Sequence, residues 1–140
     1  MFQFVVKYLG FLKSAPLFPQ VFESFLILWT LISRPVILDY VDDIRSKVLT
    51  WPNTSVSLHK YGGIQFNHGN KEIGHIHGNG ILDIILSRKL KAQLIKEGLA
   101  KPHHVFPKSG WISFHLYNEK DKIMALELLH RSYSKILLSN

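Results

Sequence analysis

The chain has 140 residues, no cysteine and a formal net charge of +7. This length suits one folded domain with a core of its own and leaves little room for a second. The absence of cysteine excludes a disulfide framework and thiolate chemistry, so any metal ion would need nitrogen and oxygen ligands. The basic residues are scattered and form no run, so we expect a solvated surface and do not expect nucleic acid as a partner.

The first 34 residues (1–34) form a strongly apolar segment. Its best window, 17–33, is too short for a membrane span, which takes roughly 20 apolar residues, and it contains Glu23. The pattern predicts two amphipathic helices separated near Ser14–Pro19. They either cover the core of the domain or bind a membrane surface through residues 1–33. We therefore expect a protein of the cytoplasm, or one held peripherally at the cytoplasmic membrane.

A helix is predicted next, over residues 35–49. Ile37, Val41, Ile44 and Val48 recur at three- and four-residue intervals, which places them on one helical face. We expect this face to pack on the core.

Short strands separated by glycine turns follow, and two more helices complete the chain. The predicted strands are "SVSLHKY", "IQFNH", "EIGHIH", "ILDIILS" and "WISFHLY". Ser87 and Gly98 are suited to begin and end the helix "RKLKAQLIKE", and Asn118 is suited to cap the last helix. In that last helix the expected inward residues are Ile123, Leu126, Leu129, Tyr133 and Ile136.

These elements predict one α+β domain over residues 35–140. Its two layers would be an antiparallel sheet of about five or six strands and helices packed on one face of that sheet, with the apolar helices of 1–34 added at the start.

All eight histidines lie after residue 58, and two of them share one strand. Alternation along the strand places His75 and His77 on one face and turns Glu72 to the other. His59, His68, His115 and His130 are interpreted as ordinary polar positions.

The paired imidazoles allow three interpretations. They are ligands of a metal ion, with Asp83 or the pair His103–His104 as the third ligand, or they are general bases, or they are polar residues on an open sheet face. Asp83 in turn either orients a histidine or belongs to a turn. We assign no metal and no organic cofactor; a divalent ion, if bound, would use His75 and His77.

Trp111 begins a strand directly after Ser109 and Gly110 and follows the loop with His103. A large aromatic side chain at such a position belongs either to the core or to a ligand site. The sequence contains neither the G-x-S-x-G elbow of serine hydrolases nor a phosphate-binding glycine loop.

Three stretches resemble one known family: "KEIGHIHGNGILDIILS", "LIKEGLAKPHH" and "SGWISFHLYNEKDKIMALELLHRSYSKI". They are similar to the luciferase domain of bioluminescent fungi and its short bacterial and fungal relatives, over roughly residues 56–138. The run from Lys71 to His77 carries most of the resemblance, with support from Gly98, His104, Trp111 and the closing helix.

The resemblance implies a function as well as a fold. The fungal enzyme adds molecular oxygen to a hydroxylated pyrone, has no generally assigned metal or organic cofactor, and carries an apolar anchor before its domain. This chain is much shorter than the luminescent enzymes, so we do not expect it to emit light.

From the residues and the resemblance together we expect a pocket for a small enolic or aromatic molecule, oxidised by oxygen without an organic cofactor. The expected catalytic residues are His75 or His77 as base, His104 as polariser of an oxyanion and Asp83 as orienter. The expected ligand-contacting residues are Glu72, His103, Ser109 and Trp111. The alternative is a module without enzymatic activity that binds a ligand or a membrane surface.

Overall fold

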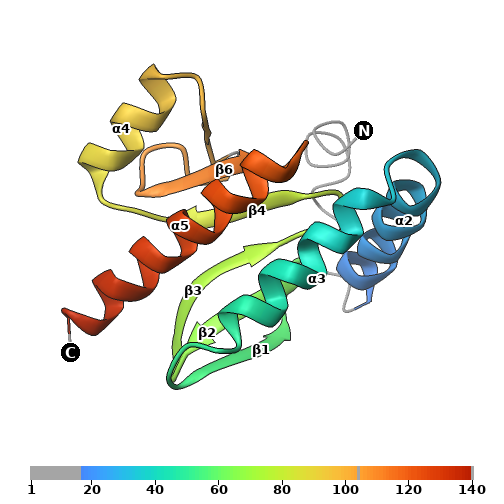
Figure 1. Ribbon diagram of the computed structural model, residues 1–140, viewed down its shortest axis with the longest axis horizontal. Helices are drawn as coiled ribbons and strands as arrows, with labels where there is room; N and C mark the ends of the chain where they lie inside the picture. Colours follow the sequence, from blue (N-terminus) through green and yellow to red (C-terminus); the bar gives the residue numbers. More distant parts are fainter. Residues whose placement is uncertain (1–16, 104, 140) are drawn as a thin grey trace.

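The computed structural model describes residues 17–103 and 105–139, in which the elements follow the predicted order with one further short strand (Figure 1). The helices are α2 (Phe18–Ser33), α3 (Val36–Val48), α4 (Arg88–Lys96) and α5 (Glu119–Leu137). The strands are β1 (Thr54–Leu58), β2 (Ile64–His68), β3 (Lys71–Ile76), β4 (Ile81–Ile85), β5 (Lys101–Pro102) and β6 (Trp111–His115).

The strands form one antiparallel sheet in the order β1-β2-β3-β4-β6-β5. This confirms the predicted α+β class and the predicted number of strands. The added strand, β5, lies in a segment that was expected to be a loop, where Lys101 pairs with Ser113 and Pro102 with Ile112. A strand of two residues carries too little alternation to be found in a sequence.

The apolar core lies between the sheet and the two helices α3 and α5, which cross the same face of the sheet (Figure 1). The four α3 residues predicted to face inward, Ile37, Val41, Ile44 and Val48, are all buried there. From the sheet, Phe66 joins the same core and is fully buried. The periodicity of α3 was therefore interpreted correctly.

In helix α5 the predicted inward residues Leu129, Tyr133 and Ile136 are buried, and Leu126 packs against the core. The prediction was wrong at Ile123. Ile123 is 60% exposed, whereas Ala125, Leu128 and Leu129 are buried. Each helical residue turns the side chain by about 100°, so Ile123, two positions before Ala125, points about 200° away from it. The buried stripe of α5 therefore begins at Ala125, two positions after Ile123.

Local signals fixed the helix ends as predicted. The Ser87 hydroxyl accepts a hydrogen bond from the Leu90 amide at 3.3 Å, and Gly98 follows α4 with a φ of 71°. Asn118 accepts hydrogen bonds from the first turn of α5, while the Asp121 carboxylate accepts one from the Asn118 amide at 3.1 Å. This reciprocal pair is a capping box, which stabilises the start of a helix.

Helix α2 lies against one end of the molecule and contacts α3 (Figure 1). Its inward residues are Pro19, Glu23, Leu26 and Thr30, so two of the four are polar. The second amphipathic helix expected in the apolar segment would fall on residues 1–16, outside the described residues. Within the described part of the chain, no helix combines the length and apolarity that crossing a bilayer requires.

Candidate active site

The site lies on the sheet face opposite the apolar core, where three neighbouring strands align polar residues. His75 on β3 pairs with Asp83 on β4, and Asp83 pairs with Ser113 on β6. Paired residues of antiparallel strands project to the same face, so the three side chains meet there. All three residues are buried.

Glu72 also lies on this face, so the prediction that it points away from His75 was wrong. Its Oε1 is 2.7 Å from His75 Nδ1. The register of β2 with β3 shifts between Phe66 and Asn67, whose partners are Gly74 and Glu72, so Ile73 is an extra residue. This β-bulge turns the residues before it to the opposite face.

The bulge is stabilised from the core side. Ile73 is fully buried in the apolar core, and its carbonyl oxygen accepts a hydrogen bond of 2.8 Å from the Ser132 hydroxyl on α5. A bulge disrupts the strand ladder locally, and Ser132 gives the affected carbonyl group a buried partner. Helix α5 thereby maintains the backbone shift that brings Glu72 to His75.

Asp83 is the centre of the site and is fully buried. Its Oδ1 accepts a hydrogen bond from the Ser113 hydroxyl. Its Oδ2 is 3.4 Å from His75 Nε2, 3.6 Å from His103 Nε2 and 3.8 Å from His77 Nε2. Among the described residues this oxygen has no hydrogen-bond partner. Asp83 is therefore not a turn residue but the common neighbour of three imidazoles.

The charge of Asp83 and His75 is set by their mutual contact. Burial raises the pKa of Asp83, but His75 and the Ser113 hydroxyl outweigh it and lower the pKa to about 2. Burial lowers the pKa of His75, but Asp83 and Glu72 outweigh it and raise the pKa to about 8. At neutral pH the Asp83 carboxylate is therefore ionised, and the His75 imidazole is mostly protonated.

His77 contacts helix α2 through a residue that sequence reasoning did not select. Its Nδ1 is 2.9 Å from Glu23 Oε2, and the other oxygen of Glu23 accepts a hydrogen bond from the Gly78 amide. Glu23 is 8% exposed, although it belongs to the apolar N-terminal segment. A Cβ at Gly78 would lie 2.2 Å from Ile27 Cγ1, so glycine is needed for α2 to approach this closely.

His59 was interpreted as an ordinary polar residue, and this was wrong. Its ring stacks on His75, with centroids 3.7 Å apart and planes 12° apart, and the residue is 5% exposed. A Cβ at Gly63, in the turn after β1, would lie 2.5 Å from the Ile76 carbonyl oxygen and 3.2 Å from His77 Nδ1, so glycine allows this turn to approach the end of β3 closely. Burial, reinforced by the charge of His75, lowers the pKa of His59 to about 4.

The loop after β5 brings His103 to the site. Its Nδ1 accepts hydrogen bonds from the Val105 and Phe106 amides, both at 3.1 Å, and its Nε2 faces Asp83. Lys91 of α4 fastens this loop, because its Nζ donates to the carbonyl oxygens of Pro107 and Ser109 at 2.7 and 2.6 Å.

Ser109 and His104 of this loop were also predicted to belong to the site. Ser109 uses its hydroxyl inside the loop, donating to the Phe106 carbonyl at 2.7 Å and accepting from the Trp111 amide at 3.2 Å. His104 lies outside the described residues, so its role as polariser stays a prediction.

Trp111 lies on the histidine face and not in the apolar core. It is half-buried, and its ring centroid is 5.7 Å from that of His75 and 5.8 Å from that of His103. Its neighbours Ile112 and Phe114 are buried, and both belong to the core. Trp111 therefore forms part of the wall around the imidazoles.

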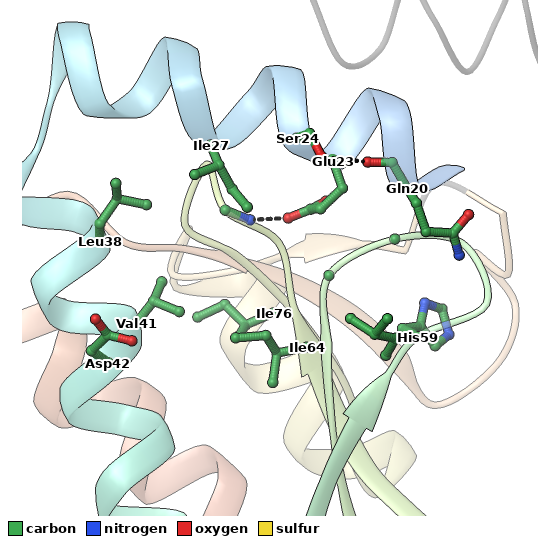
Figure 2. A pocket seen from close by; sticks show the side chains of 14 residues that line it. Gln20, Glu23, Ser24, Ile27, Leu38, Val41, Asp42, His59, Ile64 and Ile76 are labelled. Carbon is green, nitrogen blue, oxygen red and sulfur yellow. Dashed lines mark hydrogen bonds between the residues drawn. The ribbon is translucent and has the colours of Figure 1, made fainter. Parts of the chain in front are cut away.

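A cavity of about 450 Å³ lies beside the cluster, between α2, α3 and the turn after β1 (Figure 2). His59 and Glu23, which contact His75 and His77, also line the cavity. Its apolar lining includes Ile27, Leu38, Val41, Leu58, Ile64 and Ile76. His75 and His77 are not among the lining residues, so His59 is the imidazole on this wall.

Two sets of residues have donor atoms close enough to share a metal ion, within 4.8 Å of one another. They are His59, Glu72 and His75 in the first set and His75, Asp83 and His103 in the second. Both contain only nitrogen and oxygen donors, as expected for a chain without cysteine.

Comparison with known families supports the resemblance seen in the sequence. The model of the family described as "Luciferase domain" matches residues 70–132, which run from β3 through β4, α4, β5 and β6 into most of α5. Comparison with curated proteins and with solved structures gives no match. The matched stretch contains His75, His77, Asp83 and His103, whereas His59 and Glu23 lie before it.

Proposed function

We propose that this chain, whose residues 70–132 carry a luciferase-family domain, binds a small enolic or aromatic molecule in the cavity beside the histidines. One observation carries the proposal: the cavity and the buried cluster share His59 and Glu23. Its volume of about 450 Å³ lies in the range of small-molecule sites. Its mostly apolar lining with a few polar groups suits a flat, weakly polar ligand.

His59 is the residue best suited to contact the enol. Its Nδ1 is buried and lacks a hydrogen-bond partner within the described parts of the chain. Its lowered pKa of about 4 keeps the ring neutral at pH 7, so one ring nitrogen can accept a hydrogen bond. His75 and His77, favoured as bases from the sequence, have both ring nitrogens facing carboxylates.

Oxidation would then follow from loss of the enol proton. The enol O–H bond breaks, the proton passes to an imidazole, and the electron pair is delocalised onto the neighbouring carbon. That carbon forms a bond to molecular oxygen, which is reduced to the peroxide level, and the proton returns to give a hydroperoxide. The positive charge on His75, stacked against His59, would stabilise the enolate. This step needs oxygen and no organic cofactor.

Binding of a hydroxylated 2-pyrone, measured by calorimetry, tests the proposal. The pyrone without its hydroxyl group is the ligand control, and His130→Ala, outside the cluster, is the protein control. We expect His59→Ala to weaken binding of the hydroxylated ligand about tenfold, as for loss of one hydrogen bond. Unchanged binding in His59→Ala would overturn the role of the cavity. Oxygen consumption by the wild-type complex tests the oxidation, and a bound ligand that consumes none would leave a binding module.

A second role is supported by the outer face of α2. Val21, Phe25, Leu28, Trp29 and Ile32 are large apolar residues that are each between 48% and 74% exposed. Such a row on one helix is typical of attachment to a membrane surface. We propose that α2 binds lipid in this way. Flotation of the full chain with anionic vesicles should be reduced by Trp29→Ser combined with Leu28→Ser, and equal flotation of the two proteins would exclude this role.

A further inference from the structure

The cavity beside the histidines has two buried polar atoms that lack a partner. Gln20 Oε1 and His59 Nδ1 are buried, and neither has a hydrogen-bond partner among the described residues. The two residues come from different walls of the cavity, Gln20 from α2 and His59 from the turn after β1. A buried polar atom without a partner is costly, so both atoms favour a ligand that supplies hydrogen bonds.

The packing of α2 on the turn after β1 brings these two residues to the same end of the cavity. Gly62 of that turn lies so close to α2 that a Cβ there would be 2.9 Å from the Pro19 carbonyl oxygen. Gln20 directly follows Pro19 on the helix. Figure 2 shows Gln20 and His59 on the same side of the cavity. The polar head of one ligand can therefore meet both side chains.

The rest of the cavity is mainly aliphatic. Leu38 and Val41 of α3 lie at the end opposite the two polar atoms, and Ile64 and Ile76 lie between the two ends (Figure 2). The histidine aside, the described lining residues include no ring on which an aromatic group could stack. Burial of methylene groups against such a surface is favourable. This part of the cavity therefore suits an aliphatic chain.

The mouth of the cavity extends this apolar surface. Ile27 and Leu58 line the cavity and are both exposed, so they lie where it opens to solvent. Leu31, four residues after Ile27, lies beside it on the same side of α2 and is exposed as well. A chain longer than the cavity thus meets apolar side chains where it emerges.

The charges of the lining disfavour an anionic head group. Glu23 and Asp42 line the cavity, whereas its described lining includes no lysine or arginine. An acidic ligand would lie near two acidic side chains without a basic one to pair with, which is costly. A neutral hydroxyl group instead donates a hydrogen bond to Gln20 Oε1, which can only accept.

We propose that the ligand of this cavity is an amphiphile, with a neutral hydroxylated aromatic head between Gln20 and His59 and an aliphatic chain along Leu38 and Val41. This inference rests on the proposed function, because it concerns the same cavity. It adds the chain, the neutral head and the part of Gln20. Gln20 is thereby a specificity-determining residue, because it accepts the hydrogen bond of the head group.

Calorimetry of the full chain with four benzene derivatives tests the proposal. The wild type should bind 4-hexylphenol about 100-fold more tightly than 4-ethylphenol, because each further buried methylene group contributes about fourfold. 4-Hexylanisole lacks the hydroxyl hydrogen and should bind about tenfold more weakly than 4-hexylphenol. 4-Hexylbenzoate, which is anionic, should also bind at least about tenfold more weakly.

Two pairs of variants locate the head and the chain. Gln20→Met, which is close in shape to the original, should weaken binding of 4-hexylphenol about tenfold and leave binding of 4-hexylanisole unchanged. Gln93→Met, at an exposed position of α4, is its control and should change neither. Leu38→Asn should weaken binding of 4-hexylphenol more than that of 4-ethylphenol, whereas Leu28→Asn, on the outer face of α2, should leave both unchanged.

Equal affinity of the wild type for 4-hexylphenol and 4-ethylphenol, or tighter binding of 4-hexylbenzoate than of 4-hexylphenol, would overturn the proposal. So would unchanged binding of 4-hexylphenol in Gln20→Met, or a loss in Leu28→Asn as large as in Leu38→Asn. Should Leu38→Asn be unfolded by circular dichroism, the wild-type affinities for the four compounds decide instead. A wild type that binds the hydroxylated pyrone but neither phenol contradicts this inference alone, whereas failure to bind all three contradicts the proposed function as well.

Discussion

The two faces of the sheet are built from the same strands but have opposite chemistry. One face presents residues such as Phe66 and Ile73 to α3 and α5 and is apolar and fully buried. The other buries His75, Asp83 and Ser113 almost as completely. Burial of apolar surface stabilises a fold, whereas burial of charged and polar groups does so only when every group has a partner. The first face therefore supplies the stability that keeps the second in place.

This difference explains why the histidine face is better understood as a site than as a core. Asp83 Oδ2 and His59 Nδ1 are both buried without a hydrogen-bond partner in the described residues. A core selected for stability alone would have few such atoms. Substitutions on the two faces should accordingly have different consequences, which four experiments can measure.

The largest effect is expected on the apolar face. Phe66→Ala should lower the free energy of unfolding by about 3–5 kcal/mol, because it removes a fully buried ring and leaves a cavity. Urea denaturation measures this loss. Leu58→Ala, on the neighbouring strand but 78% exposed, is the control and should change stability by less than about 0.5 kcal/mol. Similar losses for both variants would contradict the assignment of this face.

A smaller effect is expected where α2 meets the site. Gly78→Ala places a Cβ 2.2 Å from Ile27 Cγ1, so α2 must shift, at a cost of about 1–3 kcal/mol. The double variant with Ile27→Ala should recover part of this loss, because the clashing atom is removed. A double-mutant cycle measures the coupling, and strictly additive effects would show that the two residues do not meet.

The pH dependence of stability, measured in the presence of a chelator, should reflect the protonation of His75 and His59 on the histidine face. Because the pKa of His75 is raised to about 8, its protonation contributes about 2 kcal/mol to the free energy of unfolding. This contribution is fully present below pH 6.5 and is lost as the pH rises through 8. The pKa of His59, lowered to about 4, makes the fold lose stability as the pH falls from 6.5 toward 4. Stability should therefore be greatest at about pH 6.5.

Thermal denaturation across pH 4–9 tests this expectation. His75→Gln should remove the decline between pH 6.5 and 8 and keep the decline at lower pH. A wild-type stability that increases from pH 6.5 to 8 would contradict the charge assigned to His75.

The smallest effect is expected at Ile123, on the outer side of α5. It is 60% exposed, so Ile123→Ala should change the free energy of unfolding by less than about 0.5 kcal/mol. Leu129→Ala in the same helix is fully buried in the core and should cost about 2–5 kcal/mol. Urea denaturation of both variants checks which stripe of α5 faces the sheet.

Much of the fold was predictable because it depends on interactions between residues close in the sequence. Side chains within one turn of a helix, or alternate side chains of a strand, are neighbours whatever the rest of the chain does. This is why the inward face of α3, the helix caps at Ser87 and Asn118, and the shared face of His75 and His77 could be inferred correctly. The luciferase-family resemblance also followed from a continuous stretch of the sequence.

The site itself depends on neighbours that are distant in the sequence. Glu23 is separated from His77 by 54 residues, and its helix has apolar residues on its outer face, so periodicity alone could not select it as an inward residue. His59, directly after β1, stacks on His75 of β3, and only the pairing of β1, β2 and β3 reveals this contact.

The sequence by itself determined the order and type of the elements, because these depend on contacts between residues a few positions apart. The tertiary structure alone decided where Glu72 points, because the extra residue Ile73 is accommodated by a bulge against α5, and strict alternation assumes that no such residue exists. It also decided that the imidazoles converge on Asp83. Strand register and helix docking are settled by the packing of the whole core, which no single segment contains.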